Sequence, residues 1–316
     1  MRRILLLALL LAAPLAGHAR ACGVPPPAVV DIDANGYYDD SHHAHVDPLR
    51  KARNDAAVKP VNDYLNAVAH AAVAWQRGRA DPDARCALGW LAAWADGRAM
   101  LGTMTTEQSY YMRKWTLAGL ALAYARVRPA ATADERRRID AWLLALADAT
   151  IRHADAHKGV RNNHYYWEGL AVAATGAVTG DARCRAWGRG VFDAALAQVR
   201  PDGALPHELE RGPKALHYHL FAAAPLVMMA SIFDAQAAPL DRLVAFAVHG
   251  VADPSAIAAL AGTAQETPDR MPAWIAVYRR HGGRVDVPAA VPPTDWDARL
   301  GGDPNLANPL EHTRAP

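Results

Sequence analysis

The stretch TADERRRIDAWLLALA (132–147) decides what kind of structure this chain forms. Its first four residues have the pattern of a capping box, in which the side chains of Thr132 and Glu135 each accept a hydrogen bond from the other residue's backbone N–H at a helix start. Apolar side chains then recur at the spacing of one helix face: Ile139, Trp142, Leu143 and Leu146. We therefore predict an amphipathic α-helix that begins directly after Thr132.

The same helical spacing, or a helix start signal, recurs on both sides of this stretch. The segments are residues 58–76, 85–100, 182–199 (capped by Gly180-Asp181) and a long one from Pro213 past Met229. Pro225 lies inside the last pattern and is expected to kink it. No convincing run of alternating strand residues occurs, so we expect an all-α chain of about ten helices of ordinary length. Periodicity alone leaves open whether they form a bundle, a solenoid or an α/α toroid.

The first 21 residues have the pattern of a secretory signal peptide. Two arginines form a positive start, residues 4–11 are apolar, and residues 19–21 match an A-x-A cleavage signal. A lipoprotein that begins at Cys22 is the alternative, but the residues before this cysteine fit a lipobox poorly. We expect a periplasmic or secreted protein. We expect no membrane association, because no later segment is apolar for long enough to span a bilayer.

The remaining residues, 22–316, are interpreted as a single domain, although a chain of this length could also form two domains of typical size. Residues 24–50 and 283–316 are rich in Pro, Gly, Asp and His, and we expect a loop or lid region and an irregular C-terminal arm. Of the three cysteines, one pair and one leftover is the simplest count in an oxidising compartment. Pairing Cys22 with Cys86 would tie a loose N-terminus to a core helix and leave Cys184 reduced; three free thiols are the alternative.

The nearly equal numbers of basic and acidic residues argue against a strong electrostatic field over the whole molecule. The whole chain has 34 Lys and Arg against 32 Asp and Glu. Loss of Arg2, Arg3 and Arg20 with the signal peptide leaves 31 basic residues against 32 acidic ones, a net charge of −1. An anionic partner must therefore be held by locally clustered cations. We expect no nucleic-acid partner.

Two polar segments carry the candidate chemistry. The first, RNNHYYW (161–167), precedes the apolar run 170–178, and its asparagines suit a helix start. Free N–H groups at a helix N-terminus favour an anion, so His164 and the two amides could bind a uronate. Ordinary capping with a buried histidine is the alternative, and for this segment alone it is the favoured one.

The second segment, PHELERGPKALHYH (206–219), holds three His, one Tyr, one Arg and one Lys at a loop and helix start. Arg211 precedes Pro213 and is expected before the helix, whereas Tyr218 is expected inside it. The plain alternative is a surface pair of Glu208 with Arg211 and a core tyrosine. Taken alone, this segment is also weak evidence.

Together the two segments resemble polysaccharide lyase family 5, the alginate lyases that act on poly-β-D-mannuronate. The matching residues are Asn162-Asn163-His164, Tyr166-Trp167, Leu205-Pro206, Glu208-Leu209, Arg211, Ala215-Leu216 and Tyr218-His219. Further matches in the same order are Cys22 with Pro25-Pro26-Pro27, Cys86-Ala87-Leu88 with Trp90, Met112-Arg113-Lys114-Trp115 and Arg299-Leu300-Gly301-Gly302. The resemblance covers most of residues 22–316. It implies an incomplete α/α toroid with a deep, tunnel-like central cleft.

The resemblance also implies the site residues. It places the catalytic group on Asn163, His164, Arg211 and Tyr218. Arg211 and Asn163 would neutralise the uronate carboxylate, so that negative charge can develop as the C5 proton leaves. Tyr218 would protonate the departing O4, and His164 or Tyr218 would take the C5 proton. As a base at neutral pH, Tyr218 would need nearby cations such as Arg211, Lys214 and His164 to lower its pKa.

Further substrate contacts are implied for five residues: Tyr38, Arg113, Trp167, Lys214 and His219. The family's mobile lid is matched by residues 36–40, but no lysine precedes the tyrosine, and Ser41-His42-His43-Ala44-His45 follows. A metal site in this histidine run is conceivable, but a solvated lid loop is the favoured interpretation. Tyr165 is bulkier than the resemblance leads us to expect and would narrow the subsite beside His164.

The leading hypothesis is a monomeric lyase that needs neither a metal nor another cofactor and cleaves mannuronate-rich alginate by β-elimination. It would leave a 4,5-unsaturated uronate at the new non-reducing end. One alternative is the same reaction on another anionic polysaccharide, such as polyglucuronate. Another is an inactive periplasmic polysaccharide-binding paralogue, although all four matched catalytic positions are filled. Zinc-dependent hydrolysis rests only on the histidine run.

Overall fold

The computed structural model describes residues 22–157 and 159–311, so the predicted signal peptide lies outside the described residues. Within these ranges helices dominate, and the only β-structure is a few isolated bridges. The α-helices are α1 (Pro48–Gly78), α2 (Asp81–Asp96), α3 (Glu107–Val127), α4 (Ala133–Ala156), α5 (Asn163–Thr179), α6 (Ala182–Leu196), α7 (Pro206–Leu209), α8 (Ala215–Phe233), α9 (Ala238–Ala252), α10 (Ser255–Ala261) and α11 (Trp274–Arg280). Short 3-10 helices are η1 (Arg128–Ala130), η2 (Gly212–Lys214) and η3 (Ala298–Leu300). The predicted all-α class is confirmed.

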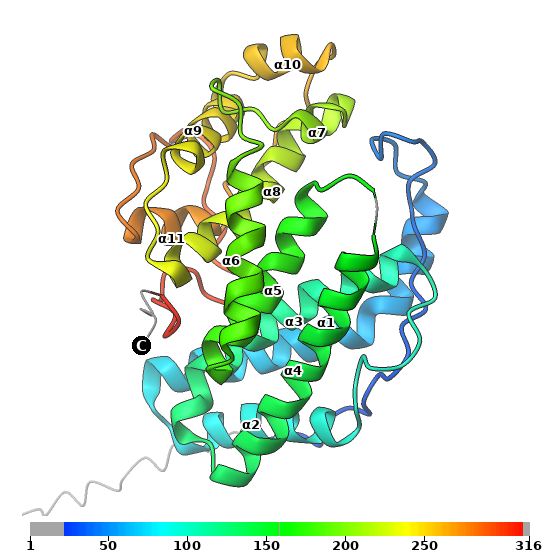
Figure 1. Ribbon diagram of the computed structural model, residues 1–316, viewed down its shortest axis with the longest axis vertical. Helices are drawn as coiled ribbons and strands as arrows, with labels where there is room; N and C mark the ends of the chain where they lie inside the picture. The colour runs from blue at the N-terminus through cyan, green and yellow to red at the C-terminus, as the bar shows by residue number, and fades with distance from the viewer. Residues whose placement is uncertain (1–21, 158, 312–316) are drawn as a thin grey trace, which may run out of the picture.

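Helices α3 and α5 form the centre of the fold. α3 packs on α1, α4 and α5, and α5 also packs on α6 and α8. Both helices are buried on nearly all sides, as expected for helices covered by several neighbours. Figure 1 shows the array running from α2 at one end of the molecule to α10 at the other, with the N-terminal segment along one side.

Local sequence signals set several of the helix boundaries. α4 begins at Ala133, and both hydrogen bonds of the predicted capping box at Thr132 are present. α6 begins after Asp181, whose carboxylate accepts from the backbone N–H of Cys184 at 2.7 Å. α2 ends at Asp96 rather than at the expected Met100, because the chain turns there. α8 continues through Pro225 to Phe233 as one helix.

The N-terminal segment is tied across α2 and α3 before it reaches the predicted lid. Cys22 is bonded to Cys86, with Cα atoms 5.2 Å apart, and Cys184 is free and buried, so the predicted pairing is confirmed. The chain-entropy estimate for a closed loop of this length is about 4 kcal/mol. The indole N–H of Trp94 donates to the Pro26 carbonyl at 3.0 Å. Residues 36–45, which we call the lid, therefore start from an anchored base.

Helix α8 with the preceding η2 turn, residues 212–233, is the one described helix long and apolar enough to cross a bilayer. However, 83% of its most apolar window is buried by the rest of the chain. It therefore has the packing of a core helix, on which α5, α9 and α11 rest.

The C-terminal arm folds back onto α3. Arg126 donates from Nε to the carbonyl of Gly301 at 3.2 Å. Gly301 has a φ of 78°, and a side chain there would collide with Leu122 on α3. This close approach holds η3, and with it Arg299, against the central helices.

Candidate active site

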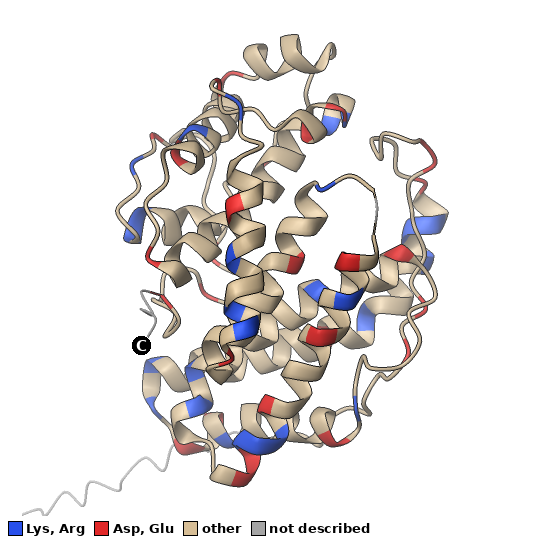
Figure 2. Ribbon diagram, viewed as in Figure 1, with Lys and Arg blue, Asp and Glu red and all other residues tan. Residues whose placement is uncertain are grey.

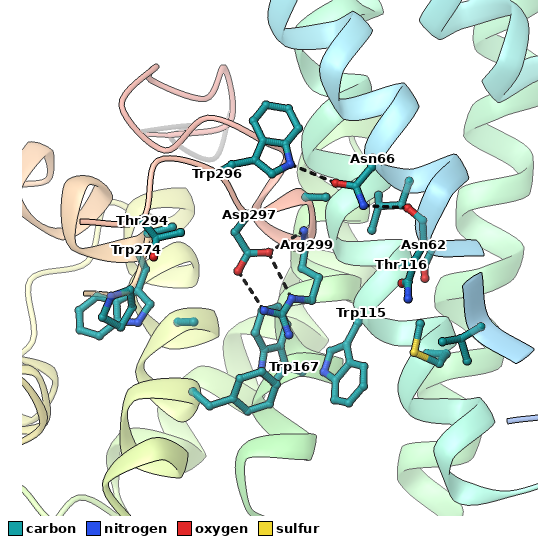
Figure 3. A pocket seen from close by; sticks show the side chains of 18 of the residues that line it. Asn62, Asn66, Trp115, Thr116, Trp167, Trp274, Thr294, Trp296, Asp297 and Arg299 are labelled. Carbon is teal, nitrogen blue, oxygen red and sulfur yellow. Dashed lines mark hydrogen bonds and ion pairs between the residues drawn. The ribbon is translucent and has the colours of Figure 1, made fainter. Parts of the chain in front are cut away.

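A cleft of about 590 Å³ opens between α1, α3, α8 and the C-terminal arm. Four tryptophans contribute to its walls: Trp115, Trp167, Trp274 and Trp296 (Figure 3). Arg299 points into the same space and is held by the carboxylate of Asp297 through contacts of 3.2 and 3.1 Å. Its guanidinium lies 5.6 Å from the ring of Trp167. Flat apolar faces beside a fixed cation suit a sugar ring that carries a carboxylate.

Charge elsewhere on the molecule is mixed. Figure 2 shows basic and acidic residues interspersed along the helices. This distribution agrees with the near-zero net charge of the chain. An anionic ligand would therefore be held by particular residues such as Arg299, not by a field over a whole face.

Beside the cleft, Tyr218 and Arg211 lie against each other. The guanidinium carbon of Arg211 is 4.7 Å from the centre of the Tyr218 ring. The Tyr218 hydroxyl donates to the hydroxyl of Tyr38 in the lid at 2.9 Å. Burial raises the pKa of Tyr218 to about 12, and the opposing effects of Tyr38 and Arg211 are smaller. Arg211 thus lowers the pKa of Tyr218, as expected, but burial raises this pKa by more. Tyr218 is therefore a neutral phenol at neutral pH.

The lid also covers Arg211. Its Nη1 lies 2.6 Å from His43 Nδ1 and 3.4 Å from the His42 carbonyl. His42 Nδ1 is 2.9 Å from the carbonyl of Glu210, and the imidazole of His45 pairs with Asp39 at 2.7 Å. The histidine run therefore contacts the chain beside Arg211. Among the described residues, no group of three or more His, Cys, Asp or Glu side chains is arranged to hold a metal ion.

Asn163 and His164 open helix α5, as the segment pattern predicted. The amide nitrogen of Asn163 donates to both oxygens of Glu208, at 3.1 and 2.9 Å. That nitrogen, which the resemblance assigns to a substrate carboxylate, is therefore already engaged. Glu208 is fully buried, so it does not form the exposed pair with Arg211 that was the plain alternative.

The ring of His164 stacks on Tyr111, with centroids 3.7 Å apart. Burial lowers its pKa well below the usual value, and Lys114 and Arg211 add to this effect, so the imidazole is neutral. His164 also lines a separate side chamber of about 140 Å³ next to Tyr165. The Tyr165 side chain lines this chamber and makes an edge contact with Trp187, with ring centroids 5.9 Å apart.

The other predicted substrate residues are dispersed. Trp167 lines the cleft. Lys214 pairs with Glu266 at 2.9 Å, and Arg113 is buried and donates to the Ala149 carbonyl at 3.1 Å. His219 is fully buried: its Nε2 accepts from the Leu205 N–H at 2.9 Å, and its Nδ1 donates to the Ala215 carbonyl at 2.7 Å. Burial lowers the pKa of His219 to about 4, and both ring nitrogens serve the fold.

Sequence reasoning missed several residues that the structure brings to the site. Trp115 and Arg299 stood only as parts of matching segments, and Trp296 and Asp297 were assigned to an irregular arm. Glu208 stood as part of a matching segment, and the plain alternative placed it in a surface pair. The segment matches were a usable signal for Trp115, Arg299 and Glu208, whereas the burial of Glu208 depends on how two distant segments meet.

The chain was compared with known proteins. The alginate lyase family model matches residues 31–257. A polysaccharide lyase of Stenotrophomonas maltophilia is 40% identical over 96% of this chain and 95% of its own length. Alginate lyases of Azotobacter vinelandii and Pseudomonas aeruginosa are 33% and 30% identical, over 78% and 83% of this chain and 71% and 77% of theirs.

Solved structures agree in fold. A variant of alginate lyase A1-III in complex with a tetrasaccharide superposes with a TM-score of 0.79 at 24% identity, over 96% of this chain and 88% of that one. Alginate lyase A1-III from Sphingomonas species A1 gives a TM-score of 0.75 at 23% identity, over 96% and 92%. The predicted α/α toroid is thereby confirmed.

Proposed function

Because this chain belongs to the alginate lyase family, polysaccharide lyase family 5, we propose that it cleaves mannuronate-rich alginate by β-elimination at the 4-O-glycosidic bond. The product is a 4,5-unsaturated uronate at the new non-reducing end. The observation that carries the proposal is the contact of a buried arginine, Arg211, with a buried phenol, Tyr218, beside an aromatic cleft that contains Arg299.

Arg211 supplies charge where the reaction develops it. Loss of the C5 proton spreads negative charge onto the uronate carboxylate, and a guanidinium can meet both oxygens of that group. The Nη1 of Arg211, now in contact with His43, is the atom that a substrate carboxylate would take over. Arg299, which lines the cleft, suits the carboxylate of another sugar along the polymer.

The two proton transfers fit two different groups. Tyr218 carries its proton at neutral pH and is suited to donate it to O4 as the glycosidic bond breaks. A Tyr218 that received the C5 proton would first have to lose its own, against a pKa raised to about 12 by burial. The neutral imidazole of His164 needs no such step. We therefore assign the acid to Tyr218 and the base to His164.

We also propose that the protein works outside the cytoplasm as a monomer. The signal-peptide pattern of residues 1–21 supports export, and the Cys22–Cys86 disulfide suits an oxidising compartment. The cleft and the residues around Tyr218 all come from this one chain, which is compatible with a monomer.

The proposal is tested with purified protein and three polymers: polymannuronate, polyguluronate and polyglucuronate. Formation of the unsaturated product is followed by its ultraviolet absorbance. We expect the fastest cleavage of polymannuronate. Faster cleavage of either other polymer would reject the mannuronate assignment, and no absorbance change with any of them would reject the lyase assignment.

A further inference from the structure

We infer that Glu208 is a positioning residue for the proposed reaction: its buried carboxylate fixes the orientation of the Asn163 amide and forms an ion pair with the guanidinium of Arg211. This inference rests on the proposed function. It gives a role in the site to a side chain that the plain alternative placed in a surface pair.

Glu208 makes three hydrogen bonds to one residue. Its Oε1 accepts from the backbone N–H of Asn163 at 2.8 Å and from the amide nitrogen of the same residue at 3.1 Å. Its Oε2 accepts from that amide nitrogen at 2.9 Å. Glu208 and Asn163 are both fully buried. A buried carboxylate with three donors has little freedom to move, and neither has the amide that it holds.

The same carboxylate reaches Arg211. Glu208 Oε2 lies 3.8 Å from Arg211 Nε, on the opposite edge of the guanidinium from the Nη1 that contacts His43. Arg211 is only 7% exposed, and among the described residues Glu208 is the one acid within ion-pair distance of it. The Nε of Arg211 makes no hydrogen bond among the described residues, so Glu208 acts on it through charge, while Nη1 faces the lid, where a substrate carboxylate would bind.

The fixed amide has a chemical consequence. Because the nitrogen of Asn163 is bound to Glu208, the free end of its amide is Oδ1, a buried acceptor with no hydrogen-bond partner among the described residues. An acceptor repels a carboxylate and suits a sugar hydroxyl. Glu208 thus fixes Asn163 as an acceptor and leaves the uronate carboxylate to Arg211.

A purely structural role makes a different prediction. Glu208 caps the first N–H of helix α5, and a glutamine could do the same through its side-chain oxygen. In Glu208→Gln, however, an NH₂ group takes the place of Oε2 and faces the amide nitrogen of Asn163. Two NH₂ groups cannot bond to each other, so the Asn163 amide keeps only its contact with the remaining side-chain oxygen, or turns over and loses that contact instead. Glu208→Gln therefore preserves the cap but removes the two-oxygen contact that fixes the amide.

The test is a double-mutant cycle on polymannuronate with wild type, Glu208→Gln, Asn163→Ala and the double variant. We expect Glu208→Gln to lower kcat about 10- to 100-fold, because the reacting groups lose their fixed geometry. KM should change less than about threefold, since the cleft still holds the polymer. In the Asn163→Ala background the same substitution should cost less than about threefold in kcat, because the amide it acts through is gone.

Glu311→Gln is the matched control. The Glu311 side chain is 4% exposed, accepts from a backbone N–H at 2.9 Å and pairs with Arg280 at 2.7 Å, but it lies in the C-terminal arm. It should lower the melting temperature without changing kcat. If Glu208→Gln does not fold, Glu208→Asp replaces it in the cycle. It keeps the charge but shortens the reach, and it should lose activity only when Asn163 is present.

Three results would overturn the inference. One is a Glu208→Gln enzyme whose kcat falls no more than that of Glu311→Gln. The second is a loss that is equally large with and without the Asn163 side chain. The third is a wild-type protein that cleaves none of the three polymers, which would reject the proposed function and this inference together; the first two leave the proposed function standing.

Discussion

The open cleft and the proposed catalytic cluster beside it, which comprises Asn163, His164, Glu208, Arg211 and Tyr218, are built in different ways. In the cleft, Arg299 is already held by Asp297, and Trp115 and Trp296 are partly exposed along the walls. In the cluster, the reactive side chains contact the lid: Tyr218 bonds to Tyr38, and Arg211 lies against His43. The cleft is therefore preformed, whereas under the proposed function Tyr218 and Arg211 would exchange lid contacts for substrate contacts.

This difference predicts how substitutions should divide. Changes in the cluster should act on turnover, because its interactions matter most as charge and protons move. Changes in the cleft should act on KM, because its contacts are the same before and during the reaction. Changes in the lid should act on how readily the cluster is uncovered.

The largest effect is expected for Tyr218→Phe, which removes the phenolic oxygen and keeps the ring. If Tyr218 protonates O4, kcat should fall about 10²- to 10⁴-fold with little change in KM. The matched control is Tyr64→Phe, because Tyr64 is also buried and its hydroxyl donates to the Trp90 carbonyl at 3.1 Å. Near-normal turnover of Tyr218→Phe with an unchanged melting temperature would show that another residue is the acid.

Arg211→Ala should have the next largest effect, and it should differ in kind. The substrate carboxylate is negative in the ground state and interacts more strongly as C5 loses its proton, so KM should rise and kcat should fall about 10²- to 10³-fold. Arg211→Lys should recover only part of the loss, because an ammonium cannot make a two-pronged contact. A change in KM alone would place Arg211 with the cleft and not with the cluster.

How well the sequence predicts a contact in these two regions depends on how far apart the contacting residues lie along the chain. The start of α4 is set by Thr132 and Glu135, which are close in sequence, and it was predicted correctly. Contacts across the site are not local: Tyr218 meets Tyr38 from 180 residues away, and Arg211 meets His43 from 168. No periodicity carries that information, and resemblance to a family was needed to bring these residues together.

Contacts between distant parts of the chain also explain why some residues lie elsewhere than the resemblance suggested. Lys214 pairs with Glu266 from a distant loop, and His219 is turned inward by the backbone of its own region. Glu208 is charged, and charged residues are mostly exposed, so its burial could not be predicted without knowing that α7 meets the start of α5.

In the cleft, Arg299→Ala should raise KM for polymannuronate about 10-fold and change kcat less than about threefold. A fixed cation that meets one carboxylate in a partly exposed groove contributes to binding, not to the chemistry. The control is Arg279→Ala, an exposed arginine that donates to the Val285 carbonyl at 3.0 Å and does not line the cleft. A kcat loss as large as that of Arg211→Ala would show that the two regions are not separate.

The smallest effect is expected in the lid, and it should depend on pH. His43 faces Arg211, with Asp40 and the Tyr38 ring close by. Burial lowers its pKa, and Arg211 lowers it further, so the closed lid contains a neutral His43 whose Nδ1 accepts from Arg211. With the lid open, His43 should return to a pKa of about 6.5. As the pH falls through that value, protonation favours the open lid, because a cationic His43 cannot accept from Arg211 and is repelled by it.

Hydrogen exchange of residues 36–46, corrected for intrinsic rates, should therefore rise a few-fold between pH 7.5 and pH 5.5, while that of α5 stays constant. His43→Gln can still accept through its side-chain oxygen but does not titrate, so this variant should lose the pH difference. The same change at His45 is the control: its partner Asp39 raises the pKa of His45, so protonation strengthens that contact and does not open the lid. A pH response that survives in His43→Gln would assign the opening to another group and would leave the lid's contact with Arg211 without a role in covering the cluster.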